Sequence, residues 1–135
     1  MNIKINKGYD LDIEGAPLKD VADVAVGNLI KLLPSDFPGV KPKLLVENGD
    51  HVKKGQPVYF DKVNKDVVFT APISSVVQEI KLGERRTIEY IALRPEGDEE
   101  IESKHYTLEE ILTLTNDDIV KILCSSGLWP MIRRR

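Results

Sequence analysis

A run of turn signals between residues 46 and 72 restricts this chain to a fold of short strands. Asn48-Gly49-Asp50 and Lys54-Gly55-Gln56 stand a few residues apart, and Thr70-Ala71-Pro72 closes the run. Asn-Gly favours a type I′ hairpin turn, because both central residues of that turn need a positive φ. Only short extended pieces fit between such closely spaced turns, so we expect β-structure joined by tight turns here.

Between residues 40 and 97 the chain alternates short β-branched and aromatic runs with turn residues. The pattern predicts six strands, at Lys43–Val46, Val52, Val58–Phe60, Val67–Thr70, Val76–Ile80 and Thr87–Leu93. Strands at this spacing favour a barrel or sandwich over a βαβ sheet. Residues 46–50 and 80–84 also share one pattern, an apolar residue, two further residues, glycine and an acid. This echo indicates two similar halves.

Residues 1–39 are expected to form an N-terminal segment of strands and loops. Ile3 and Ile5 alternate with polar residues, and the same two-residue period returns a few residues later, as in a half-buried strand. Residues 20–33 fit both a helix and a strand, and their valine content favours strand and turn. Two prolines and a glycine then predict a loop over residues 34–39.

Residues 98–135 differ from the strands before them and predict a short helical segment. An acidic link leads to Thr107, which forms the start of a capping box with Glu110. Apolar residues at helical spacing follow within residues 116–123, and Gly127 supplies a stop signal.

The chain closes on an apolar stretch, Leu128 to Ile132, followed by three arginines. An apolar terminus of this kind normally packs against another part of a protein. We therefore expect the native protein to continue beyond Arg135.

Composition places the chain among soluble globular domains and disfavours several other classes. It has 135 residues, of which 41% are apolar and 30% charged, and its formal net charge is −3, so disorder is disfavoured. The one dense basic cluster, residues 133–135, is not interleaved with aromatic residues, so we expect no nucleic-acid partner. No apolar run is long enough to span a membrane. One cysteine, Cys124, forms no intrachain disulfide and cannot alone ligate an iron–sulfur cluster.

Side-chain chemistry predicts no catalytic, cofactor-binding or metal-binding residue. His51 and His105 lack the spacing of metal ligands, and Cys124 follows an apolar helix face typical of a core residue. Glu99-Glu100 lies in a link, and Asp117-Asp118 lies at a helix start, where the helix dipole favours acids. None of the serines stands in a G-x-S-x-G elbow. Those considered are Ser35, Ser74, Ser75, Ser103, Ser125 and Ser126. We therefore expect a binding or structural domain.

The run from Gly49 to Val58, with Ala71-Pro72 after it, resembles the biotinyl/lipoyl-like hammerhead domains. The resemblance implies a mainly β barrel-sandwich hybrid of two pseudo-symmetric halves, here followed by a short C-terminal helical segment. In the swinging-arm carriers of this fold, a lysine on the hairpin between the halves is modified. Lys65 lies near that point, within Asp61–Asp66, but its neighbours are neither Met-Lys-Met nor Asp-Lys-Ala. A lipoyl or biotin carrier is therefore an alternative rather than the preferred interpretation.

A second resemblance covers nearly the whole chain and concerns the NqrA family, the A subunits of the sodium-translocating NADH:quinone oxidoreductases. The matching segments are Lys7–Ile13, Gly15–Pro17, Val40–Pro42, Gly49–Pro57, Phe60–Lys62, Val67–Pro72, Gly83–Arg86, Ser126–Trp129 and Arg133–Arg135. Each segment alone is weak evidence for the family, but the occurrence of all of them in this order over this span is specific to it. One departure is Ser74-Ser75, where that family usually has Ser-Gly, so a different local turn is expected there.

The resemblance implies a peripheral subunit on the cytoplasmic face of the bacterial inner membrane. The complex would oxidise NADH, reduce ubiquinone and export sodium ions, using flavins and an iron–sulfur centre. This chain would itself bind none of the complex's cofactors and would not be catalytic alone. It would act as a structural and assembly domain that contacts the other subunits, with a contribution to quinone binding. A subunit of the related Rnf electron-transport complex, which shares the barrel, is a further alternative.

Overall fold

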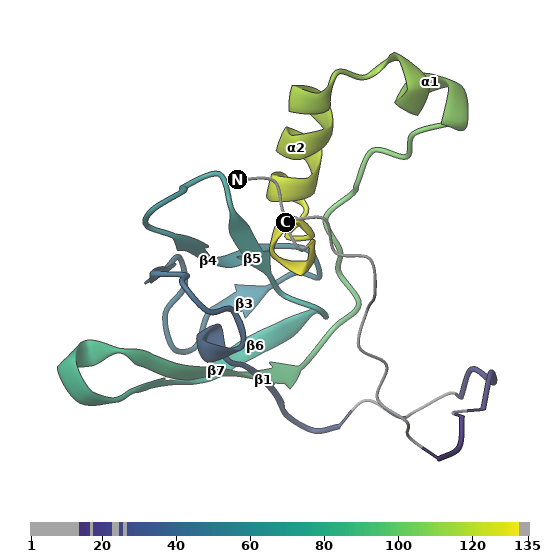
Figure 1. The fold of residues 1–135 in the computed structure, drawn as a ribbon. Helices are drawn as coiled ribbons and strands as arrows, with labels where there is room; N and C mark the ends of the chain where they lie inside the picture. Colours follow the sequence, from purple (N-terminus) through teal and green to yellow (C-terminus); the bar gives the residue numbers. More distant parts are fainter. Residues whose placement is uncertain (1–13, 17, 23–24, 26, 133–135) are drawn as a thin grey trace.

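The fold is described for residues 14–16, 18–22, 25 and 27–132 of a computed structural model (Figure 1). Within these residues, two antiparallel sheets form a barrel-sandwich, with strand orders β1-β7-β6-β3 and β2-β4-β5. The strands are β1 (Ile30–Leu32), β2 (Pro42–Leu44), β3 (His51–Val52), β4 (Pro57–Asp61), β5 (Val68–Thr70), β6 (Ser75–Leu82) and β7 (Ile88–Pro95). The predicted mainly β fold class is confirmed.

The larger sheet is built on the long hairpin of β6 and β7. β1 pairs with the outer side of β7, and β3 pairs with the other side of β6. β7 thus lies inside the sheet, and three of its consecutive residues, Ile91, Ala92 and Leu93, are all buried. A register shift between Val77 and Glu79 marks a bulge in β6.

The core lies between the two sheets and consists mainly of valine, aromatic and other apolar side chains. Val58 and Tyr59 are adjacent in β4, yet both are buried. Strand alternation would place one of them outside, but the register of β4 shifts between Pro57 and Tyr59, which turns both inward. Val77 and Leu93 meet them from the larger sheet.

The strands predicted between residues 40 and 97 are present as β2 to β7. β1 lies in the segment before them and pairs with β7. The predicted loop over residues 34–39 contains a single 3₁₀ turn, η1 (Pro34–Asp36). The strands expected near Ile3 and a few residues after it lie outside the described residues. The division into 1–39, 40–97 and 98–135 stays a prediction.

The hairpin predicted at Asn48-Gly49 is wrong, although a turn does occur there. The Asp50 N–H donates to the Glu47 carbonyl, but only Gly49 of the two central residues has a positive φ, 92°. The strands on either side, β2 and β3, lie in different sheets. The Asn48 Oδ1 accepts a hydrogen bond from the Ile80 N–H of β6 at 2.8 Å. The turn therefore carries the chain from one sheet to the other instead of closing a hairpin.

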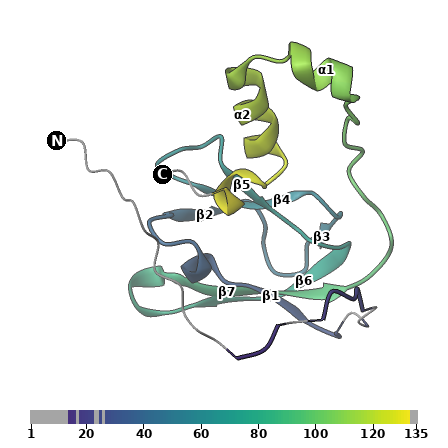
Figure 2. The same cartoon turned by 45° about the vertical axis from the view of Figure 1, so that its right-hand side comes forward.

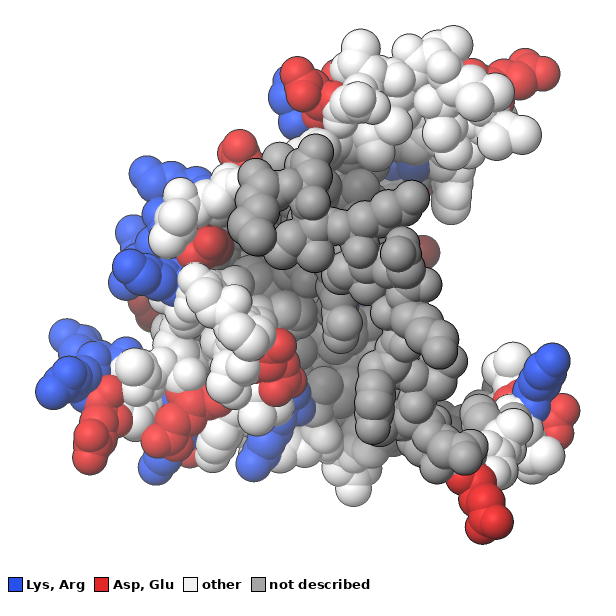
Figure 3. Space-filling model, in the orientation of Figure 1, with Lys and Arg blue, Asp and Glu red and all other residues white. Residues whose placement is uncertain are grey.

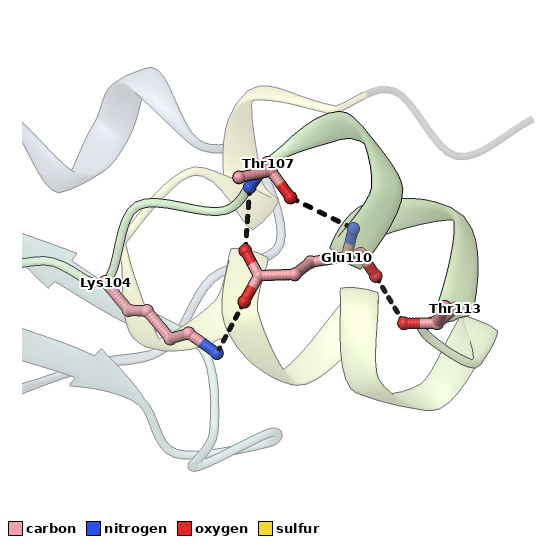
Figure 4. Close-up of polar contacts among 4 residues, drawn as sticks. All are labelled: Lys104, Thr107, Glu110 and Thr113. Atoms are coloured by element: carbon pink, nitrogen blue, oxygen red, sulfur yellow. Dashed lines mark hydrogen bonds and ion pairs between the residues drawn. The ribbon is translucent and has the colours of Figure 1, made fainter.

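Two short helices follow the barrel, α1 (Leu108–Thr113) and α2 (Asn116–Ser125). In α1 the Glu110 N–H donates to the Thr107 Oγ1 at 3.2 Å, and the Thr107 N–H donates to Glu110 Oε2 at 2.8 Å (Figure 4). The Lys104 Nζ lies 3.7 Å from the other Glu110 oxygen. The predicted capping box is confirmed, and Thr115 forms a second one with Asp118 at the start of α2. No helix in the described part of the chain is long and apolar enough to cross a membrane.

After α2 the chain folds back onto the smaller sheet at Gly127, whose φ is 75°. Figure 2 shows the following 3₁₀ turn, η3 (Trp129–Met131), beside β5, while α1 stands apart from the barrel. The half-buried Trp129 packs against the core. The predicted helix stop is confirmed, and one side chain of the apolar stretch 128–132 is anchored on the barrel.

We expect Gly127→Ala to destabilise the chain by about 2 kcal/mol. Alanine is strained at a positive φ, and its Cβ would clash with Thr70. A Cβ at Gly127 would lie 2.8 Å from the Thr70 Oγ1 and 3.1 Å from its Cγ2. Chemical denaturation measures the loss. Gly39→Ala is the matched control, because Gly39 has a φ of 90° and free space around it. An equal loss in both variants would show that the Thr70 contact contributes nothing.

Lowering the pH should destabilise the first turn of α1. The hydrogen bond from the Thr107 backbone and the charge of Lys104 lower the pKa of Glu110. A carboxylate with a depressed pKa stabilises the helix start above its unfolded pKa and loses that effect as the pH falls through the folded pKa. The protection factors of the amides of residues 108–113, which are corrected for the intrinsic exchange rate at each pH, should therefore fall at acidic pH. Glu110→Gln should remove most of that pH dependence, and unchanged dependence in this variant would contradict the expectation.

Candidate functional site

An aromatic cluster forms the centre of the smaller sheet. The rings of Tyr59 from β4 and Phe69 from β5 stack with centroids 4.3 Å apart and planes 8° from parallel. Phe37, which follows η1, meets Phe69 edge-on at 4.9 Å. Stacked and edge-on pairs of this kind add to the stability gained by burial. The cluster therefore holds a rigid apolar wall in one place.

A cavity of about 340 Å³ lies between this wall and the returning C-terminal segment. Tyr59, Phe69 and Phe37 line one side, while Leu128 and Met131 line the other. Leu128 and Met131 are themselves 54% and 67% exposed, so this side of the cavity is open. The turn at Gly127, between α2 and η3, places the two sides opposite each other.

The electrostatics of this cavity favour binding over proton transfer. Burial, with a smaller contribution from the negative charge of Asp36, raises the pKa of Tyr59 above its ordinary value. The hydroxyl therefore stays protonated at physiological pH and can take part in hydrogen bonds, but it cannot act as a base. A flat apolar group with one polar atom is the kind of ligand that such a wall accepts.

Lys65 lies in the loop that joins β4 to β5, so the predicted hairpin at Asp61–Asp66 is present. Lys65 is exposed, as the carrier alternative requires. The loop is tightly organised, because Asp61 Oδ1 accepts hydrogen bonds from the Lys41 and Val63 N–H groups.

The other candidate residues of the sequence do not come together. Cys124 is buried at the end of α2, and burial, with Asp66 nearby, raises the pKa of its thiol. His51 and His105 are exposed in separate parts of the chain. Within the described ranges, no three His, Cys, Asp or Glu side chains are grouped so that they could hold a metal ion.

The acidic pairs have structural partners in the described part of the chain. Glu100 lies 3.1 Å from the Lys54 Nζ, and Glu99 lies 3.6 Å from the Lys53 Nζ. Asp118 caps α2 through Thr115. Ser75 is buried in β6.

The aromatic cluster was not predicted from the sequence. Tyr59 and Phe69 face each other across the β4–β5 hairpin, whereas Phe37 comes from a separate segment, and each alone is typical of an ordinary core residue. The available signal was weak, since two of the three lie in predicted strands and could have faced either side. Their convergence depends on the pairing of β4 with β5.

Comparison with known proteins identifies the family. Residues 3–96 match the NqrA N-terminal barrel-sandwich hybrid domain. Proteins named as the A subunit of a Na(+)-translocating NADH-quinone reductase are 42% identical in Yersinia pestis over 133 residues and 40% identical in Serratia proteamaculans over 135 residues. The one in Neisseria meningitidis is 39% identical over 133 residues. Each alignment covers 98% of this chain and 30% of the relative, so the chain spans about 30% of the length of these curated relatives.

The domain match covers the strands β1 to β7, and the relatives extend the similarity through the helical segment to nearly the whole chain. The resemblance inferred from the sequence is thus confirmed: the chain belongs to the family of NqrA N-terminal barrel-sandwich hybrid domains.

Proposed function

We propose that this chain is the N-terminal domain of a peripheral subunit in a respiratory complex that oxidises NADH, reduces ubiquinone and exports sodium ions. The observation that carries the proposal is 42% identity, through 98% of the chain, to proteins named as the A subunit of a Na(+)-translocating NADH-quinone reductase. The complex would lie at the bacterial inner membrane, with this domain on the cytoplasmic face. A Rnf-type subunit is the weaker alternative, because the relatives named above carry the name of the sodium-translocating enzyme.

We assign a structural and assembly role to the domain itself. α1 has no buried residue, and its Leu108 and Leu112 side chains are 74% and 78% exposed. They are four residues apart, so they share one helix face. Figure 1 shows α1 at the outer end of the C-terminal helical segment, away from both sheets. An apolar helix face held away from its own core suits contact with another part of a larger assembly.

The cavity beside Tyr59 supports a contribution to quinone binding. A quinone headgroup is flat and apolar with carbonyl oxygens at its edge, and the aromatic wall with one protonated hydroxyl suits such a ring. No flavin, nicotinamide or iron–sulfur group is assigned to this domain. Those cofactors would belong to other parts of the complex.

The assembly role predicts that Leu108→Glu with Leu112→Glu, introduced into the full-length protein, abolishes co-purification with the other subunits. Both side chains are exposed, so the thermal unfolding of this domain should not change. Leu45→Glu is the control, because Leu45 is a half-exposed barrel residue away from α1. Co-purification of the double variant at the wild-type level would exclude α1 from assembly.

The carrier alternative makes a separate prediction, which rests on the exposed Lys65 of the β4–β5 loop. Expressed together with lipoyl and biotin ligases, the chain should keep its unmodified mass. Intact mass spectrometry makes the measurement, and Lys65→Arg identifies the position if mass is added. Addition of a lipoyl or biotinyl group at Lys65 would favour a carrier over an assembly domain.

A further inference from the structure

The tip of the β6–β7 hairpin holds two arginines in an unfavourable backbone conformation. Arg85 and Arg86, in η2 (Glu84–Arg86), have φ values of 54° and 59°. The Thr87 N–H donates to the Glu84 carbonyl at 3.1 Å, which closes a turn with two left-handed central residues. This is the geometry of a type I′ turn, which normally takes Asn-Gly. The hairpin imposes this geometry, but arginine is not the residue that the geometry favours, and local costs of this kind concentrate at functional positions.

These arginines line a cavity of about 550 Å³ together with Lys41 and Lys62. The floor is apolar and includes Phe37 and Ile88, and no acidic residue lines it. Within the described residues, none of the four cations forms a salt bridge. A chain with a net charge of −3 thus presents four positive charges around one opening. Figure 3 shows basic side chains along the side of the molecule that carries the β6–β7 hairpin, with acidic side chains between them.

Each of the two hairpins also exposes an aliphatic side chain that lies close in sequence to its cations. Val63, next to Lys62 in the β4–β5 loop, is 70% exposed. Leu82, at the end of β6 just before the arginine turn, is 43% exposed. The same loop adds the exposed Lys65. Cations that flank exposed aliphatic residues are typical of surfaces that lie on a bilayer, with the charges at phosphates and the apolar groups at the acyl boundary.

Three possible anionic partners differ in what they explain. A free phosphate would use the cations but leave Val63 and Leu82 without a role. An acidic protein segment would need fixed donors, whereas these cations stand on long exposed side chains, at two hairpin tips and, for Lys41, just before β2. An anionic lipid surface uses both the charges and the aliphatic side chains. Acidic side chains stand near the same cations: Glu84 is exposed in the arginine turn, Glu89 lies against Gly83, and the β4–β5 loop includes Asp66.

We propose that the β6–β7 and β4–β5 hairpin tips form a contact surface for the phosphate headgroups of anionic phospholipids. Arg85, Arg86, Lys41 and Lys62 would bind the phosphates, and Val63 and Leu82 would enter the boundary with the acyl chains. The choice of a bilayer as partner rests on the proposed function, which places the domain beside a membrane. The contact would orient the domain there independently of the assembly face on α1.

The test is co-sedimentation of the 135-residue chain with vesicles of phosphatidylcholine alone or with about a third phosphatidylglycerol. The chain should bind only the anionic vesicles, and binding should weaken as salt is raised. Arg85→Asn with Arg86→Gly should lower the affinity on the order of tenfold. This variant installs the preferred type I′ residues, so its unfolding midpoint should stay equal or rise. Val63→Ser should also weaken binding.

The control is Lys53→Gln with Lys54→Gln, which removes the same charge from lysines paired with Glu99 and Glu100. Its vesicle binding should remain at the wild-type level. The proposal is overturned if the wild-type chain does not bind anionic vesicles, if both double variants lose binding equally, or if inorganic phosphate displaces the chain at matched ionic strength. No other subunit is present, so failure here is separate from failure of co-purification through α1.

Discussion

The fold depends on the turn at Glu47–Asp50, where the chain passes from one sheet to the other. The Asn48 side chain accepts the Ile80 N–H, and the Gly49 N–H donates to the Val77 carbonyl at 2.8 Å. These bonds fix the crossing to β6 at its bulge, where the ladder with β7 is interrupted. The sheets can then face each other and enclose the core, because β2 and β3 are neighbours in sequence but belong to opposite sheets.

Only the later part of the C-terminal helical segment packs against the barrel. Cys124 is buried against the core, Trp129 is half-buried, and Gly127 lets the backbone approach Thr70 closely. α1 contributes nothing to this core and is held in shape by its own capping box. Local hydrogen bonds at a helix start can maintain a short helix that tertiary packing does not support, although such a helix is marginal. This division leaves the barrel as a self-contained unit and the apolar face of α1 available for a partner.

Two turns of the barrel, at Asn48-Gly49 and at Arg85-Arg86, each adopt a conformation that their residues do not predict. Asn48-Gly49 has the residues of a type I′ turn but adopts a different one, because the Asn48 side chain is engaged by β6. Arg85-Arg86 has the wrong residues and adopts the left-handed geometry, since the β6–β7 hairpin imposes it. The pattern shared by residues 46–50 and 80–84 is accordingly not repeated in conformation, as Gly49 has a φ of 92° and Gly83 one of −93°.

The sequence alone determined the features that depend on neighbours in the chain. Strand positions from β2 to β7, the capping box at Thr107 and the stop at Gly127 follow from local periodicity, side-chain acceptors and glycine conformation. The tertiary structure alone decided which sheet each strand joins, that β1 completes the larger one, and that Phe37 joins the stacked Tyr59 and Phe69 rings to form one wall. It also gathered cations from separate loops around one opening. These features depend on contacts between residues far apart in the chain, and such contacts leave no local pattern to read.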